Sequence, residues 1–161
     1  DAVCRTLIFV SVILIAAVTV DGYIARHNLE ITNWSQDLKL FKDQTMGCPV
    51  IMGSNTFKTL ANELDGRENI VVSRKDNPGQ VLSNIKAGKC FVIGGGKTYF
   101  RFLKYITDVF ITPHPYVFGS GVPLFSGKNI PEVRLDFERL LEVNKSMGIF
   151  QYQYKVKNIV D

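Results

Sequence analysis

The chain has 161 residues, of which 46% are hydrophobic, 21% charged and 11% aromatic. This length and composition fit one globular domain and exclude a disordered tail, a collagen-like repeat and a polytopic membrane protein. Nineteen lysines and arginines against fifteen acidic residues leave a net charge of +4. Because no run of five or more basic residues occurs, this charge suits an anionic small molecule at least as well as nucleic acid.

Cysteine and histidine usage argues against a disulfide framework and against a metal site. The cysteines, Cys4, Cys48 and Cys90, have no CxxC spacing, so we expect reduced structural thiols. The histidines, His27 and His114, are far apart in the sequence and do not suggest a metal cage. Since His114 lies between two prolines, we expect it in a loop rather than in catalysis.

The first element is an apolar run over residues 7–20, which allows two interpretations. It is too short to span a bilayer, but Arg5 before it and the small residues Ala16 and Ala17 near its end outline a signal peptide. Its many β-branched residues, and the turn-like Asp21-Gly22 that follows, are typical of a strand buried on both faces. Composition favours the strand.

Beyond this turn a polar connection runs to Trp34, and short apolar strands then alternate with helices. Ser35 is placed to cap a helix over 36–46, whereas the segment 81–86 is ambiguous. Apolar periodicity predicts two further helices and four strands, the helices over 56–62 and 97–106, the strands over 49–52, 70–72, 90–93 and 109–111. This alternation predicts an α/β fold with a mainly parallel sheet and helices on its faces.

The last third of the chain has a different pattern. Residues 113–131 are rich in proline and glycine, so we expect a loop there. The segments 133–143 and 149–157 flank a polar turn, and apolar side chains alternate with polar ones over 150–156. This pattern predicts an antiparallel hairpin at the edge of the sheet, within a single domain that spans residues 1–161.

The strongest local signal for chemistry is a predicted strand that runs into Gly94, Gly95 and Gly96 and then into a helix. Glycines allow a ligand to approach the backbone closely, and a helix start offers unpaired N–H groups to phosphate. The motif is neither GxGxxG nor GxxxxGK[ST], so it indicates neither a Rossmann nor a P-loop site. A tight strand–helix turn without a ligand explains it as well.

Three further polar sites have both a functional and a structural explanation. Ser73, Arg74 and Lys75 follow a strand and could hold a phosphate monoester, or could be solvated surface. Asp37 falls at a helix start, where the dipole favours a carboxylate, but it could also pair with the amidine-like edge of a heterocycle. Arg67 could clamp a substrate carboxylate bidentately or lie on the surface.

Taken together and in this order, these motifs resemble those of dihydrofolate reductases. The resemblance runs from about residue 12 to 112 and weakens through the hairpin. It rests on five motifs. They are residues 15–17 together with 21–25, residues 37–42 together with Thr45, residues 49–53 together with Thr56, residues 66–73, and residues 93–96 together with Tyr99. It implies a three-layer α/β fold with a mostly parallel central sheet, in which the apolar run supplies the central strand and residues 1–11 are an extension. It also implies a cis peptide bond within the paired glycines.

The same resemblance implies a role for each matching residue. Asp37, Thr112 and Trp34 would be catalytic, with Asp37 holding the 2-amino and N3 edge of a pterin and Thr112 supporting it. The substrate-binding residues would be Ile15, Ala17, Leu38, Phe41, Leu60, Leu64, Arg67 and Ile93. The cofactor-binding residues would be Ala16, Ile24, Gly53, Ser54, Asn55, Thr56, Ser73, Arg74, Gly94, Gly95, Gly96, Lys97, Thr98 and Tyr99. No metal is implied.

The implied activity is the NADPH-dependent reduction of 7,8-dihydrofolate to tetrahydrofolate. Hydride would pass to C6, and N5 would be protonated with electrostatic assistance from Asp37 through water. The resemblance further implies inhibition by antifolates, a cytoplasmic location and a monomer that binds neither nucleic acid nor membrane.

Departures from the family's pattern leave an alternative open. Trp34 lies closer to the acidic residue than usual, and Ser54 replaces a common arginine, so that Arg74, Lys75 or Lys97 would replace one phosphate contact. Residues 115–125 are similar to the reductase domain of riboflavin biosynthesis, which reduces a ribosylaminopyrimidine phosphate with NADPH. The alternative function is therefore that reaction or the reaction of a related pteridine reductase. Asp37 and Arg67 favour a pterin with a carboxylate tail instead. A non-catalytic binding domain would be expected to lack Asp37 or the glycine turn, and both are present.

Overall fold

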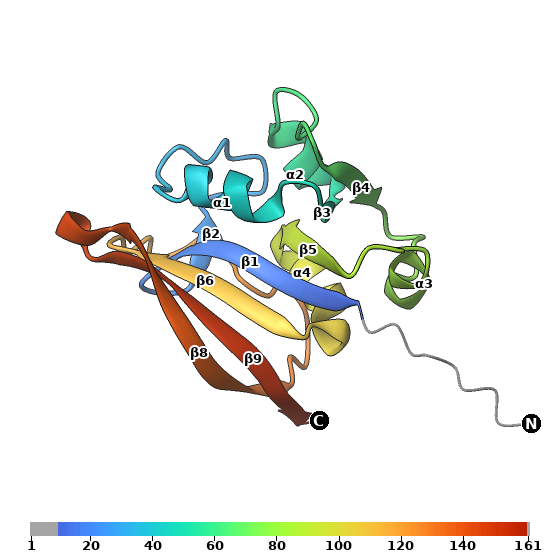
Figure 1. Cartoon of the computed structure of the whole chain (residues 1–161). Helices are drawn as coiled ribbons and strands as arrows, with labels where there is room; N and C mark the ends of the chain where they lie inside the picture. The colour runs from blue at the N-terminus through green and yellow to red at the C-terminus, as the bar shows by residue number, and fades with distance from the viewer. Residues whose placement is uncertain (1–9, 161) are drawn as a thin grey trace, which may run out of the picture.

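The computed structural model describes residues 10–160 and places a seven-stranded sheet at the centre of the molecule (Figure 1). The strand order is β4-β3-β5-β1-β6-β9-β8. The strands are β1 (Ser11–Thr19), β3 (Pro49–Gly53), β4 (Glu68–Val72), β5 (Lys89–Gly94), β6 (Asp108–His114), β8 (Glu132–Asn144) and β9 (Ile149–Val160). A second, two-stranded sheet pairs β2 (Tyr23–Ala25) with β7 (Val122–Pro123).

The sheet is parallel from β4 to β6 and antiparallel at β9 and β8. Strand β1 is the fourth of the seven strands, at the centre of the sheet, and pairs with β5 on one side and β6 on the other. Its apolar side chains are buried on both faces of the sheet, as continuous β-branched sequence in a parallel strand predicts. The predicted α/β class, parallel sheet and C-terminal hairpin are therefore confirmed.

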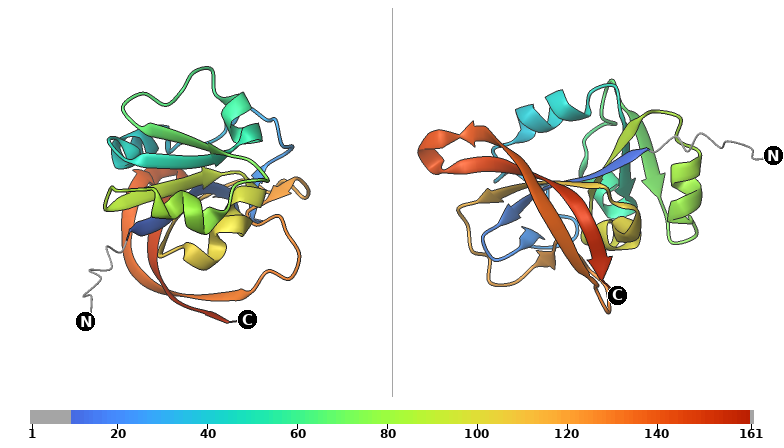
Figure 2. Two further views of the ribbon diagram at one scale, coloured as in Figure 1. Left: turned by 90° about the vertical axis from the view of Figure 1, so that its right-hand side faces the viewer. Right: turned by 60° about the horizontal axis from the view of Figure 1, so that its bottom comes forward.

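Helices cover both faces of the sheet and make a three-layer arrangement (Figure 2). On one face, Phe41 of α1 (Leu38–Thr45) and Phe57 of α2 (Ser54–Thr59) pack on a core that includes Ile13 and Phe91. On the other face lies α4 (Gly96–Phe102), whose Phe102 is fully buried, with the first 3₁₀ helix after it, and α3 (Pro78–Ser83) packs beside them.

The central strand β1 is formed by part of the apolar run near the start of the chain. Residues 11–19 form β1, so the buried-strand interpretation is confirmed for that segment. Residues 1–9, with Cys4 and most of the expected extension, lie outside the described part of the chain. Cys48 and Cys90 are both free and buried, and burial raises the pKa of the Cys90 thiol to about 12.

The short elements that the sequence did not reveal include α3, β2 and β7, and β7 lies in the segment 113–131 that we expected to be a loop. Asn77-Pro78-Gly79 has a composition typical of turns, but it starts α3: the Asn77 side chain accepts a hydrogen bond from the N–H of Gln80 at 3.1 Å, and Pro78 occupies the first turn. The polar connection before Trp34 contains β2, a three-residue strand too short for any periodicity to reveal.

Three predicted boundaries were wrong by a few residues. Helix α1 begins at Leu38 with Asp37 as its N-cap residue, so Ser35 does not cap it. Helix α2 spans Ser54–Thr59 rather than 56–62. Strand β6 continues to His114, which is 1% exposed, so the expected loop placement of His114 is corrected. The strand continues because Pro113 and His114 still pair in register with β1.

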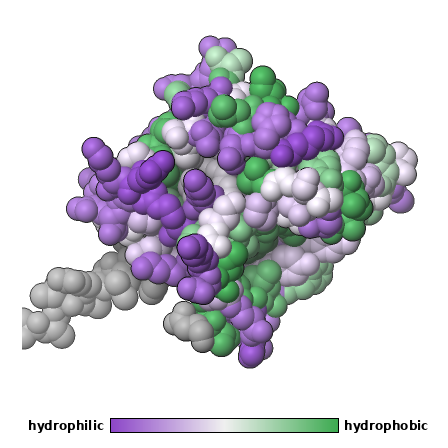
Figure 3. All heavy atoms as spheres, turned by 180° about the vertical axis from the view of Figure 1, so that it is seen from behind, coloured by the Kyte–Doolittle hydropathy of each residue, from purple (hydrophilic) through white to green (hydrophobic). Residues whose placement is uncertain are grey.

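The outer edge of the sheet is the long strand β8. Its exposed positions carry charges of both signs, at Glu132, Arg134, Asp136, Glu138, Arg139 and Glu142. Seen from behind, apolar side chains also gather near the C-terminal end of the chain (Figure 3), and Phe137 is 60% exposed. Within residues 10–160, none of the helices combines the length and apolar character needed to cross a bilayer.

Candidate active site

A cleft of about 1080 Å³ opens along the carboxyl ends of the parallel strands β1, β3, β4 and β5. This edge is where open parallel sheets bind ligands, because strand ends and helix starts meet there. The volume lies just above the range for a single drug-sized ligand, about 300–1000 Å³. The cleft therefore has room for an extended cofactor together with a substrate.

The structure brings nearly all the predicted site residues together in this one cleft. Every residue assigned to substrate binding and every residue assigned to cofactor binding lines it, as does Asp37. Trp34 and Thr112 are the exceptions: both are buried just behind the lining. Segments as far apart in the sequence as Ile15 and Tyr99 thus converge on one surface, as the register of the parallel strands requires.

Asp37 is the buried charge of the cleft. It is 6% exposed and lies at the start of α1, where its carbonyl accepts the first helical hydrogen bond from the N–H of Phe41 at 2.8 Å. Its side chain caps no backbone group, so the carboxylate stays available to a ligand. Burial raises the pKa of Asp37, while hydrogen bonds from its own backbone N–H and from the hydroxyl of Thr112 act in the opposite direction.

Thr112 lies on β6 behind this carboxylate. Its side chain is fully buried, and its Oγ1 lacks a hydrogen-bond partner of normal geometry among the described residues. The hydroxyl is nevertheless close enough to Asp37 to lower the pKa of that carboxyl. A buried polar atom without a partner is costly, so this hydroxyl is suited to a ligand or water bound beside Asp37.

Trp34 closes the site from the side of the polar connection. Its indole N–H donates to Glu30 Oε1 at 3.0 Å, and Glu30 Oε2 in turn accepts from Arg26 at 3.1 Å. The indole ring packs edge-on against His114 and Phe118, both with centroids at 5.3 Å. Trp34 thus reaches the cleft through Glu30, which lines it, rather than directly.

The outer end of the cleft combines apolar walls with a cation. Leu60 and Leu64 face Phe41 there, and all three are packed against the core of that face. Arg67 donates to Thr45 Oγ1 at 3.2 Å and to the carbonyl of Asp65 at 3.0 Å. These contacts orient the guanidinium while leaving donors free for a carboxylate.

The opposite wall is the glycine turn after β5. The peptide bond between Gly94 and Gly95 is cis, as the sequence resemblance implies. A Cβ at Gly94 would approach Thr56 Oγ1 to 3.2 Å, and one at Gly53 would approach Thr98 Oγ1 to 2.6 Å. Only glycine therefore allows these two backbones and their hydroxyls to lie so close, which leaves a smooth, hydroxyl-edged surface.

Tyr99 lies beneath this surface. Its hydroxyl donates to the carbonyl of Ile15 at 2.6 Å, and its ring is 3% exposed. Burial, with the nearby Asp37, raises the pKa of Tyr99 well above its usual range. The phenol therefore remains a neutral hydrogen-bond donor that ties α4 to the central strand.

The end of β4 forms a compact polar turn at the rim of the cleft. Asp76 accepts from the N–H of Ser73 at 2.7 Å and from its hydroxyl at 3.2 Å. Arg101 of α4 donates to the carbonyls of Ser73 and Asp76 and braces this turn. Arg74 and Lys97 line the same end of the cleft and leave it positively charged.

Some lining residues were not singled out in the sequence. Lys42, Lys58 and Arg101 add cations to the cleft, and a stretch of the polar connection adds Asn28, Glu30, Ile31 and Thr32. Lys42 could have been found, because it follows Leu38 at i+4 and so shares its face of α1. The polar connection carries no comparable signal.

Comparisons with known proteins agree with this geometry. The family model described as dihydrofolate reductase matches residues 11–115. A dihydrofolate reductase type 3 from Salmonella typhimurium is 34% identical over 113 residues, covering 62% of this chain and 68% of that protein. A dihydrofolate reductase from Haemophilus influenzae is 30% identical over 110 residues, covering 62% and 69% respectively.

The same fold occurs among solved structures. A dihydrofolate reductase from Enterococcus faecalis, complexed with NADP(H) and RAB-propyl, aligns with a TM-score of 0.69 and 19% identity. The alignment covers 92% of this chain and 97% of that one, so the antiparallel hairpin belongs to the shared fold. The match to the family model, which spans most of the cleft-forming segments, shows that the chain belongs to the dihydrofolate reductase family.

Proposed function

We propose that this protein reduces 7,8-dihydrofolate to 5,6,7,8-tetrahydrofolate with NADPH. The observation that carries the proposal is the convergence of buried Asp37, the glycine turn and Arg67 on one cleft. The carboxylate matches the amidine-like edge of a pterin, the turn matches a dinucleotide backbone, and the guanidinium matches a glutamate carboxylate. Family membership supports the same reaction.

The residues on the cofactor side fit NADPH. Gly53 and the Gly94–Gly96 turn present backbone without side chains, so a flat ring or a pyrophosphate can approach closely. Ser73 and Arg74 would hold the 2′-phosphate, and Lys97 would neutralise the pyrophosphate. Ala16, Ile24, Ser54, Asn55, Thr56, Thr98 and Tyr99 complete this side. When bound, NADPH supplies the hydride that reduces C6.

The chain's own residues position the substrate and its proton. Asp37, with Thr112 beside it, holds the 2-amino and N3 edge of the pterin, and its buried charge favours protonation at N5 through water. Ile15, Ala17, Ile93, Leu38, Phe41, Leu60 and Leu64 provide the apolar walls. Arg67, oriented by Thr45, receives the α-carboxylate at the outer end. Trp34 acts indirectly, through Glu30 and the packing behind Asp37.

The experiment is a side-by-side NADPH oxidation assay with two substrates. With dihydrofolate, we expect the absorbance of NADPH to fall as the cofactor is oxidised. With a ribosylaminopyrimidine phosphate, we expect no change in that absorbance. An antifolate that carries a protonated diaminopyrimidine should inhibit the reaction, because Asp37 would pair with that cation. Turnover of the pyrimidine phosphate alone would assign the chain to the riboflavin-type reaction instead.

We further infer that the enzyme acts as a cytoplasmic monomer. Cys48 and Cys90 are free and buried, which suits a reducing compartment. The charged side chains along β8 disfavour edge-to-edge pairing of two sheets.

A further inference from the structure

His114 makes two hydrogen bonds next to the start of α1. Its Nδ1 is 2.8 Å from the carbonyl oxygen of Thr112, and its Nε2 is 2.9 Å from the backbone nitrogen of Gln36. The side chain is 1% exposed. The imidazole therefore bridges the end of β6 to the residue that immediately precedes Asp37.

The two partners fix the state of the ring. A carbonyl oxygen can only accept a hydrogen bond, so Nδ1 must carry the proton. A backbone N–H can only donate, so Nε2 must be the unprotonated acceptor. The neutral Nδ1–H form of His114 is the one that satisfies both bonds, because a protonated Nε2 would point its hydrogen at the N–H of Gln36.

The local sequence explains why the ring lies there. Phe110, Thr112 and His114 alternate along β6 and so share the face of the sheet on which α1 lies. Pro115 restricts the backbone of His114 to extended conformations, which keeps that alternation up to the last residue of the strand. Trp34 packs edge-on against the ring at 5.3 Å and closes its remaining side.

Helix α1 has few other anchors near its start. Thr45, in its last turn, is the helix's one buried residue, and Leu38 in its first turn is 60% exposed. The polar anchor at the other end of the helix is the amide pair between Gln44 and Gln151, with distances of 2.6 and 3.0 Å. Apolar packing alone therefore does not fix where α1 begins, and the bond from His114 does so at Gln36.

We propose that His114 is the positioning residue for Asp37: it sets the distance between the start of α1 and Thr112 on β6. This inference rests on the proposed function and adds to it a residue that lies outside the cleft lining. The physical reason is that one ring holds both the backbone before the carboxylate and the backbone of the threonine behind it. Displacing reacting groups by about 1 Å can cost a hundredfold in rate.

Three substitutions separate positioning from simple packing. His114→Gln can keep an acceptor near the position of Nε2, so it should retain the bond to Gln36. His114→Asn can keep a donor near Nδ1 but does not reach Gln36, and His114→Phe fills the space with neither bond. We expect single-turnover hydride transfer to fall about tenfold or more in the Asn and Phe variants and by less than about threefold in the Gln variant. The KM for NADPH should change little in all three.

A matched control corrects for lost stability. Lys155→Met breaks an ion pair to Asp108 at the far end of the sheet and should lower the melting temperature without lowering the hydride-transfer rate. Equal rate losses in the Gln and Asn variants, or losses that simply follow melting temperature, would overturn the positioning role. Retained rates in the Asn and Phe variants would overturn it as well.

A second readout does not depend on activity. The chain has only two histidines, so ¹⁵N spectra of the His114→Phe variant assign the ring signals of His114 in the unaltered protein. We expect the Nδ1–H form, with slow hydrogen exchange at the amide of Gln36 that is lost in the Asn variant and kept in the Gln variant. The Nε2–H form would refute the proposal. An absence of dihydrofolate turnover in the unaltered protein would instead refute the proposed function.

Discussion

At the scale of single residues, the site depends on a carboxylate that the fold holds away from water. Asp37 is buried at a helix start without capping it, and burial is the largest influence on its pKa, which is raised. A raised pKa means that the ionised form is less stable in the folded protein than in the unfolded chain. Asp37 is therefore expected to lower the stability of the protein at neutral pH.

The substitution Asp37→Asn tests this trade between function and stability. Below the usual aspartate pKa of 3.8, both states are protonated and the carboxyl costs nothing. As the pH rises through that value toward the raised folded pKa, the unfolded chain releases its proton first and stability is lost. We expect Asp37→Asn to melt at a higher temperature than the parent at pH 7, and the difference to vanish near pH 3. Circular dichroism melts across this range measure it.

The same substitution should lower hydride transfer at pH 7 by about a hundredfold or more, since an assisting acid–base group typically contributes 10²–10⁴. Stopped-flow measurement of NADPH absorbance gives the rate. A variant that is more stable and equally fast would show that Asp37 has no part in the reaction. Asp43, on the same helix but not in the cleft lining, provides the matched control as Asp43→Asn.

Arg67 should distinguish the two ligands. Arg67→Leu removes the cation at the outer end of the cleft and should weaken dihydrofolate binding by about tenfold to a hundredfold, as for a charge-assisted hydrogen bond of 1.5–3 kcal/mol. Binding of NADPH should be unchanged. Arg67→Lys keeps the charge without the bidentate geometry, so its affinity for dihydrofolate should lie between those of the parent and the Leu variant. Equal weakening of both ligands, measured by fluorescence titration, would contradict the assignment.

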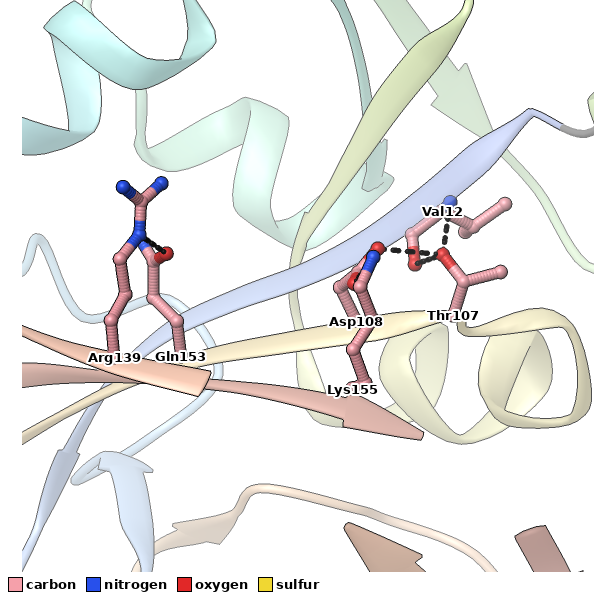
Figure 4. Close-up of polar contacts among 6 residues, drawn as sticks. All are labelled: Val12, Thr107, Asp108, Arg139, Gln153 and Lys155. Carbon is pink, nitrogen blue, oxygen red and sulfur yellow. Dashed lines mark hydrogen bonds and ion pairs between the residues drawn. The ribbon is translucent and has the colours of Figure 1, made fainter. Parts of the chain in front are cut away.

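At the scale of elements, the two ends of the sheet differ: one end lines the cleft, and the other carries polar contacts that join neighbouring strands. Figure 4 shows the latter, where Lys155 of β9 reaches Asp108 at the start of β6. Their charged atoms are 2.6 Å apart, and Thr107 Oγ1 donates to the same carboxylate at 2.9 Å while also bonding the backbone of Val12. Three strands of the sheet, β1, β6 and β9, are thus joined at the end away from the cleft.

Lys155→Met should lower the free energy of unfolding, because it removes the ion pair with Asp108. The loss should be no more than about 1 kcal/mol, because the lysine is half exposed and solvent screens the pair. The hydrogen bond to Asp108 raises the pKa of Lys155, so its contribution is present below the usual lysine value of 10.5 and is lost as the pH rises through the folded pKa. In chemical denaturation, the parent should therefore be more stable than the variant at pH 7, and the two should be about equally stable above pH 11. A constant difference would mean that the effect comes from packing rather than charge.

At the scale of the whole molecule, the sequence was informative where physical signals are local. Continuous β-branched residues identified β1, and glycines after a strand identified one wall of the cleft, because close approach to the backbone demands glycine in any context. Signals that depend on distant partners were missed. His114 looks like a loop residue between prolines until Gln36, 78 residues away, supplies its partner. Likewise, nothing near Thr112 in the sequence shows that its hydroxyl is left unpaired beside Asp37.

The outer edge of the sheet carries the last prediction, which concerns assembly. An exposed strand of 13 residues could template pairing with a second copy, and the exposed Phe137 and Leu140 on β8 would favour it. The interspersed charges oppose such pairing, because each would lose water in a shared sheet.

We expect a single species near the mass of one chain in light scattering at micromolar concentration. Replacing Asp136 and Glu138 by threonine should produce dimers or aggregates, whereas the same change at Glu63 and Asp65, outside the sheet, should not. If the parent chain is already a dimer, the charges along β8 do not protect the edge.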